Sequence, residues 1–270
     1  MAPAGCYEPI YPHVISSFHR PVQVLSLAGL VFHALLLAGC TSTGPLASIY
    51  IVSLASTRAT NAVTPLPVPN NATERDAEFV PLEIRVGYFS RCANVGRSLR
   101  SPWVCGSGVN EHLSNVLDPW NLDMLASDFK DKVVSPALNV VSALAALGFM
   151  CLISLHPLPI WKMATGRHKV SATTLIIQYA LSIHSALLAS LSLAAVMRQH
   201  VSAATLAPLL TSVTAGTITA EVGLISTTIA WVAFWVWVLS TIITMRVVQP
   251  ILTGYGYFVA TEITRLDATS

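Results

Sequence analysis

Four long apolar stretches constrain this chain more than any other feature of its sequence. They cover residues 22–40, 136–155, 170–197 and 224–245, and none of them contains Asp, Glu, Lys or Arg. A helix needs about 20 mostly apolar residues to cross a bilayer, because its backbone polar groups must be satisfied within the segment. The stretches therefore predict four membrane-spanning helices, packed as one all-α four-helix bundle.

The composition agrees with a membrane protein. Hydrophobic residues make up 53% of the chain and charged residues only 10%, whereas a soluble domain carries about 25% charged residues. We expect one four-span domain over 22–249, flanked by tails at 1–21 and 250–270, with membrane lipids as partners. The net charge of +2 comes without a Lys/Arg-rich run, so no nucleic-acid partner is expected.

The first stretch has a second interpretation. Arg20 followed by an apolar run that ends in Cys40 is also typical of a cleaved signal or a lipoprotein box. The 19 residues of this run exceed the usual signal core of about 7–15, and three further stretches follow. We therefore expect the segment to be retained as a helix.

The short connectors predict the orientation. Three of the eight residues in 162–169 are basic, whereas the connector after the third stretch holds only Arg198. Because basic residues favour the cytosolic side, both termini are expected in the cytosol and the loop 41–135 outside, in a multi-pass plasma-membrane protein. Lys130 and Lys132, placed at the outer end of span two, argue mildly against this orientation.

The loop 41–135 is too long for a connector and divides into different patterns. Residues 56–79 lack an apolar period, which predicts a mobile insertion, and the Asn71 triplet within them is a candidate glycosylation site. Residues 49–54 are rich in β-branched and aromatic side chains, and 82–88 alternate at period two. These two segments predict strands of a small antiparallel sheet.

Two cysteines of this loop predict a disulfide. Cys92 and Cys105 are 13 residues apart and enclose several turn-forming residues. Outside the cytosol such a pair is oxidised by default, and closing the loop contributes about 3 kcal/mol in the chain-entropy model. Packing or palmitoylation is expected for Cys6, Cys40 and Cys151, and no metal site, because no CxxC or histidine pair accompanies them.

The residues around these cysteines resemble a known signature, which is Gly, two apolar residues, Gly, any residue, Cys and then a distant Cys. The matching positions are Gly87, Tyr88, Phe89, Ser90 and Cys92, followed by Trp103 and Cys105. This pattern is similar to that of the fungal factor-induced-gene (mating) family of claudin-like calcium regulators and membrane fusion proteins, with its delayed-mating, fusion-defective relatives. The resemblance covers roughly 22–249. The chain departs from it at Ser90, where the family has a glycine that would tolerate a positive φ.

The resemblance implies a fold and a role. The fold would be a claudin-like left-handed bundle with a small extracellular antiparallel β-sheet in the first outer loop, and Trp103 would pack near the disulfide and the membrane surface. The role would be that of a tetraspan organiser of cell contact and membrane fusion during mating, linked to calcium influx. Partners would be a second copy or other membrane proteins at cell contacts.

An alternative is a calcium channel or transporter subunit that conducts ions as an oligomer. Cation filters use rings of acidic side chains or backbone carbonyls, and no span here carries an acid. Glu221, just outside the fourth span, is expected to be solvated rather than part of a filter. An enzyme is not expected, because the chain lacks the Gly-x-Ser-x-Gly and His-Glu-x-x-His motifs. No cofactor is expected either.

Several polar and aromatic residues inside the spans are candidates for packing. His33 and His184 are interpreted as bonding a carbonyl of a neighbouring helix, although ionisable groups in spans are functional candidates by default. Small residues at four-residue spacing in the third span predict a close helix contact. These small residues are Ser182, Ala186, Ser190 and Ala194. In the fourth span, packing or lipid contact is expected for Trp231, Trp235 and Trp237.

Overall fold

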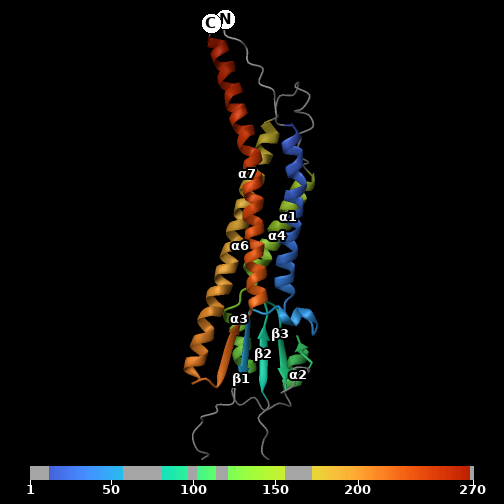
Figure 1. Ribbon diagram of the computed structural model, residues 1–270, viewed down its shortest axis with the longest axis vertical. Helices are drawn as coiled ribbons and strands as arrows, with labels where there is room; N and C mark the ends of the chain where they lie inside the picture. The colour runs from blue at the N-terminus through green and yellow to red at the C-terminus, as the bar shows by residue number, and fades with distance from the viewer. Residues whose placement is uncertain (1–11, 57–80, 97–101, 114–120, 156–171, 268–270) are drawn as a thin grey trace, which may run out of the picture. The chain divides into compact units, whose positions relative to one another are not determined.

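The structure, a computed structural model, describes residues 12–56, 81–96, 102–113, 121–155 and 172–267 (Figure 1). Its long helices are α1 (Pro12–Ala38), α4 (Ala137–Leu155), α6 (Ala172–Val213) and α7 (Leu224–Asp267). The shorter helices are η1 (Pro45–Ser48), α2 (Gly108–Leu113) and α3 (Leu122–Lys132), and the strands are β1 (Val52–Ser56), β2 (Leu82–Val86), β3 (Arg91–Val95), β4 (Val104–Cys105) and β5 (Ile218–Val222). Four of the helices are long and apolar enough to cross a membrane.

The four long helices match the four predicted spans, with differences at their ends. The first ends at Ala38 rather than at Cys40, because Cys40 adopts a left-handed φ of 58° that a continuing helix does not allow. The third continues from the predicted end at 197 to Val213. Arg198 ends the uncharged run there, but the Ala- and Leu-rich sequence that follows still favours a helix.

Some predictions fall outside the described residues. These are the basic connector 162–169, the glycosylation candidate Asn71, Cys6 and nearly all of the insertion 56–79. Lys130 and Lys132 are described, and they lie on α3 rather than at the end of the second span. Four residues, 133–136, separate α3 from α4.

The described residues group into two compact units, which are treated separately below. The bundle unit takes its residues from 1–32, 141–193 and 232–270, and the sheet unit from 33–140 and 194–231.

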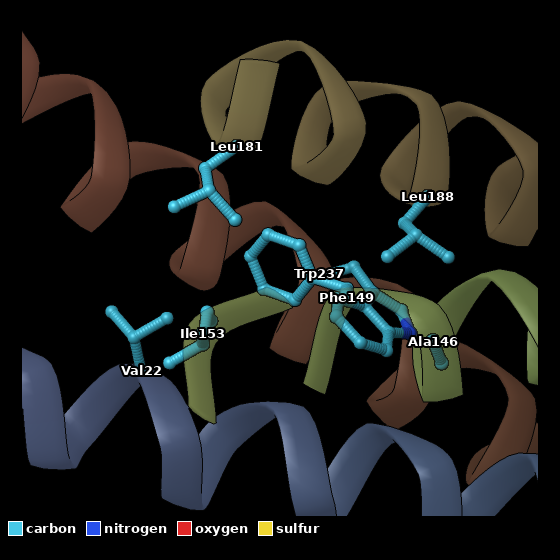
Figure 2. Packing of buried hydrophobic residues seen from close by; sticks show 7 residues of the cluster. All are labelled: Val22, Ala146, Phe149, Ile153, Leu181, Leu188 and Trp237. Atoms are coloured by element: carbon cyan, nitrogen blue, oxygen red, sulfur yellow. The ribbon is translucent and has the colours of Figure 1, made fainter. Parts of the chain in front are cut away.

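The core of the bundle unit is built from all four long helices (Figure 2). The Trp237 indole is fully buried and meets the Phe149 ring edge-on at 6.0 Å between centroids. Gly29 leaves room for this indole, because a Cβ there would lie 2.8 Å from two of its carbons. The other buried members of the cluster are Val22, Ala146, Ile153, Leu181 and Leu188.

The polar residues of the bundle unit are engaged in packing. Nε2 of His184 lies 3.0 Å from the carbonyl oxygen of Ala145 on α4, as interpreted from the sequence, and its ring stacks on Phe149. The predicted small-residue stripe is only partly buried: Ser182 is buried, but Ser190 is exposed. A four-residue spacing drifts about 40° around the helix at each step, so it cannot stay on one face.

The outward side chains of the bundle unit are apolar. Leu144 is 63% exposed and Trp235 57% exposed, whereas Trp237 is fully buried. A soluble bundle would place polar residues at such positions. These exposed side chains fit contact with lipid, and the tryptophans divide between the two roles expected from the sequence.

The sheet unit contains a five-stranded antiparallel sheet with the order β4-β3-β2-β1-β5. The central strand β2 alternates buried and partly exposed side chains, whereas β1 is buried at four of its five positions. Leu54 and Ile84 pair across β1 and β2 with neither side chain exposed. Helix α3 packs against β1 and β2 through a buried face that includes Leu122, Ala126 and Phe129 (Figure 1).

Strand β5 was not anticipated from the sequence. It follows α6 after a turn in which Ala215 and Gly216 have positive φ, and it pairs with β1 from Val52 to Ser56. Glu221 therefore lies on a strand, opposite Ser53, with an exposed side chain. It is a solvated carboxylate on the sheet.

Candidate functional site

The four-residue loop between β2 and β3 contains the family-like motif. We call residues 87–90 the motif loop. Val86 and Arg91 pair on either side of it, and the Gly87 amide donates to the Ser90 carbonyl at 2.9 Å. The loop thus closes a tight hairpin, so that Cys92 lies on β3 rather than on the strand that begins at Leu82.

Gly87 lies against the turn that ends α1. A Cβ at this position would lie 2.5 Å from the Gly39 carbonyl oxygen and 2.9 Å from the Cys40 Cβ. Gly39 is equally close to another segment, because its own Cβ would lie 2.3 Å from the Ile49 carbonyl oxygen. The two glycines let three backbone segments approach where side chains would keep them apart.

Ser90 replaces a glycine without backbone strain. The described residues other than glycine that have a positive φ are Cys40, Asn121 and Ala215, so Ser90 does not need the conformation that was in question. Its hydroxyl donates to the Cys40 carbonyl oxygen. Serine therefore adds a hydrogen bond between the motif loop and the end of α1.

Tyr88 connects the motif loop to the long helices. Its side chain is buried, and its hydroxyl donates to Oε1 of Gln199 on α6 at 2.7 Å. Nε2 of Gln199 donates to the Ser226 hydroxyl on α7 at 3.2 Å, and Ser226 donates to the Tyr50 carbonyl oxygen. The Tyr88 hydroxyl oxygen also shares a hydrogen bond with the Asn139 side chain on α4.

The chain of contacts continues to α1 through His33. Asn139 hydrogen-bonds the buried His33 ring as well as Tyr88. Because the Tyr88 proton is used on Gln199, the Asn139 amide donates to Tyr88 and its oxygen accepts from His33. We call the five side chains of His33, Asn139, Tyr88, Gln199 and Ser226 the polar chain. It contains one residue from each of the four long helices.

The polar chain predicts a marked effect of the Tyr88→Phe substitution. Phenylalanine fills the same space but leaves the buried Gln199 oxygen and the Asn139 amide without the hydroxyl. We expect a loss of about 1–3 kcal/mol of stability, seen as a lower melting temperature in detergent. Tyr179→Phe is the matched control, because Tyr179 is exposed on α6. Equal melting of both variants and the parent would contradict this role.

The predicted disulfide is present between Cys92 and Cys105, and it joins β3 to β4. Trp103 packs beside it, in a cluster with Cys40 and Ala47. The Arg85 guanidinium carbon lies 3.9 Å from the centroid of the Trp103 ring and 4.7 Å from that of Tyr50. This arginine, which sequence analysis missed, stacks on two aromatic residues of the cluster that contains the disulfide.

The Cys40 thiol is buried beside this cluster. Burial raises the pKa of Cys40 from 9.0 to about 12, although nearby Arg85 acts in the opposite direction. Burial likewise raises the pKa of Tyr88, opposed by its hydrogen bond to Asn139 and the charge of Arg198. Both groups therefore stay neutral in the folded protein at physiological pH.

These shifts predict a loss of stability in alkali. As the pH rises above about 9, the unfolded chain releases the Cys40 proton while the folded chain retains it. Stability is then lost at about 1.4 kcal/mol per pH unit for each such group. The melting temperature should fall less between pH 9 and about 11 in Cys40→Ala than in the parent. Superimposed profiles for the parent and Cys40→Ala would contradict the assignment.

The site shows no arrangement of metal ligands. Among the described residues, no group of three or more His, Cys, Asp or Glu side chains is positioned to hold a metal ion. The geometry instead shows a network of hydrogen bonds between the motif loop and those parts of the four long helices that belong to the sheet unit. Among the residues of the motif loop and the polar chain, the sequence singled out Gly87, Tyr88, Ser90 and His33. It did not single out Asn139, Gln199 and Ser226. Phe89 is the exposed member of the motif loop.

Comparisons with known proteins give one match. A family model described as "Ca2+ regulator and membrane fusion protein Fig1" matches residues 69–249, which is more than half of the chain. No curated protein and no solved structure matches the chain. The matched range contains the motif loop, both disulfide cysteines and most of the polar chain.

Proposed function

Because the chain belongs to the Fig1 family of Ca2+ regulators and membrane fusion proteins, we propose that it organises cell contact and membrane fusion at the plasma membrane during fungal mating, with a linked effect on calcium influx. The proposed role is that of a tetraspan organiser without enzymatic activity. The polar chain carries the proposal, because Tyr88 links the motif loop to side chains on α4 and α6 by direct hydrogen bonds. A partner that moves the loop would act on the helices.

The proposed placement is claudin-like, with the sheet unit outside the cell and both termini in the cytosol. The basic connector 162–169 supports it, and so does the disulfide, which forms in oxidising compartments. An epitope inserted at Gly166 should be reached by antibody only after the cells are permeabilised. Labelling of that epitope on intact cells would reverse the topology.

Ion conduction is not part of the proposal. The four candidate spans contain no Asp or Glu within their described bounds, so they offer no acidic ring for a cation. Deleting the gene and assaying mating-pair fusion, lysis and calcium uptake in parallel tests the organiser role. A deletion strain with normal fusion would refute it, and calcium flux through vesicles containing only the purified protein would favour a channel instead.

The exposed residue of the motif loop allows a sharper test in the deletion strain. Phe89 is 51% exposed, so Phe89→Ser changes the surface without opening the core. If the loop meets a partner during fusion, this variant should lower mating-pair fusion by about tenfold, as expected for an aromatic hot spot. Met124→Ser is the control, because Met124 is 67% exposed on α3 of the same unit.

Both variants must reach the surface in parental amounts for the comparison to hold. Normal fusion with Phe89→Ser at normal surface levels would exclude the motif loop as a contact surface. A similar decrease with Met124→Ser would show that the effect is not specific to the motif.

A further inference from the structure

Arg198 is an exposed cation without a partner among the residues that the structure describes. Arg85 and Arg91 of the same unit form ion pairs with Glu83 and Asp123. Arg198, in contrast, has neither an ion pair nor a hydrogen bond to a described residue, and it interrupts an otherwise uncharged helix from Ala172 to Val213. A charge in such a helix is costly unless its end reaches the membrane interface or a counter-charge.

Arg198 lines a small pocket in the sheet unit. The pocket lies next to the first turn of α4, with Leu138 and Asn139, and next to the motif loop through Tyr88. Its volume of about 20 Å³ holds roughly one water molecule or one oxygen of a larger group. An acyl chain is too large for this space, but one part of a headgroup is not.

The lining combines one positive charge with hydroxyl groups and apolar side chains. Ser135 and Ser202 supply the hydroxyls. The apolar part comes from Ile51, Val133, Val134 and Leu138. Guanidinium and hydroxyl groups together favour a phosphate, whereas the apolar side chains would gain nothing from a free inorganic ion. Because the pocket lies next to the first turn of a candidate span, it would lie at the depth of the phospholipid headgroups when α4 crosses the bilayer.

We propose that this pocket binds the phosphate of a phospholipid. Arg198 pairs with the phosphate, a phosphate oxygen enters the pocket between Ser135 and Ser202, and the glycerol backbone lies against the apolar lining. Because Tyr88 and Gln199 line the same pocket, a bound lipid would contact the polar chain directly. The protein would then have a specific lipid contact beside the motif loop.

Native mass spectrometry of the delipidated full-length protein tests the proposal. Phosphatidic acid is titrated against diacylglycerol with the same acyl chains, which lacks only the phosphate. We expect phosphatidic acid to bind and diacylglycerol not to bind. Arg198→Gln should weaken phosphatidic acid binding about five- to tenfold, the effect of one arginine on an anionic lipid. Arg246→Gln, at the end of the fourth candidate span, should leave binding unchanged.

A second variant keeps the test independent of Arg198. Ser202→Leu fills the pocket without removing a charge and should also weaken binding several-fold, with the detergent melting temperature showing that each variant is folded. Equal binding by Arg198→Gln and the parent would overturn the proposal. So would an equal loss in Arg246→Gln, which would show non-specific lipid contact, or displacement of the lipid by inorganic phosphate, which would show a free-anion site.

Discussion

Gly87→Ala is expected to destabilise the sheet unit by about 3 kcal/mol, the upper part of the range for overpacking. The added Cβ would lie 2.5 Å from the Gly39 carbonyl oxygen and 2.9 Å from the Cys40 Cβ. These atoms belong to the backbone turn that ends α1, so they cannot rotate away as a flexible side chain would. The motif loop would have to move off α1, and the contact of Tyr88 with Gln199 would move with it.

The Cys40 thiol provides the measurement. In a background with Cys6→Ser and Cys151→Ser, and with Cys92 and Cys105 bonded, Cys40 is the single free thiol. Because it is buried, a thiol-reactive dye labels it only when the turn opens. Gly87→Ala should lower the temperature at which the dye begins to label Cys40.

Two further glycines serve as references. A Cβ at Gly148, inside α4, would meet no atom within 4 Å, so Gly148→Ala should be neutral or stabilise by up to about 1 kcal/mol. A Cβ at Gly223 would lie 1.7 Å from the Tyr50 carbonyl oxygen, so Gly223→Ala should be at least as harmful as Gly87→Ala. If Gly87→Ala labelled like Gly148→Ala, the close approach of the motif loop to α1 would be wrong.

Loss of the disulfide is expected to cost about 3 kcal/mol, because the bond closes a short loop in the unfolded chain. Cys92→Ser and Cys105→Ser should have similar effects, with poor folding, reduced surface delivery and lost fusion. The double variant should be no worse than either single one, because all three lack the same bond. Surface amount and melting temperature are the measurements.

The two single variants are informative because the two cysteines differ in exposure. Cys92 is fully buried, whereas Cys105 is partly exposed, so a serine at 92 adds a small desolvation cost. Additive losses in the double variant would indicate two separate thiol roles. Peptide mapping without reduction tests the bond directly. Free thiols at both positions in folded surface protein would contradict the disulfide.

The spans and the motif could be predicted because their signals are local. An apolar run of about 20 residues has few alternative structures to a membrane-spanning helix. A glycine five residues before a cysteine, in the loop before the second span, limits where the hairpin can turn. The period-two pattern from Leu82 likewise gave β2 from its own residues. This pattern could not predict where β2 ends, because the turn at 87–90 lies within the same apolar run.

The polar chain could not be predicted because its partners are distant in sequence. Tyr88 and Gln199 are 111 residues apart, and neither residue carries a local sign of the other. Asn139, near the start of an apolar span, was the available signal, because a polar side chain in such a helix is expected to find a partner. Two further differences concern α6. Its buried side chains follow the helical period rather than a strict four-residue spacing. The helix also extends past Arg198 to Val213.

Strand β5 has a consequence for the order in which the protein is made. It completes the sheet by pairing with β1, and the partners Ala55 and Thr219 are 164 residues apart. At a synthesis rate of about 5–20 residues per second, β1 emerges roughly 10–30 s before β5 exists. During that interval the hairpin of β2 and β3 and the disulfide have all of their residues, but one edge of β1 has no strand to bind. Each newly made molecule therefore passes through a period in which the edge of β1 that β5 later covers is open to pairing with another strand.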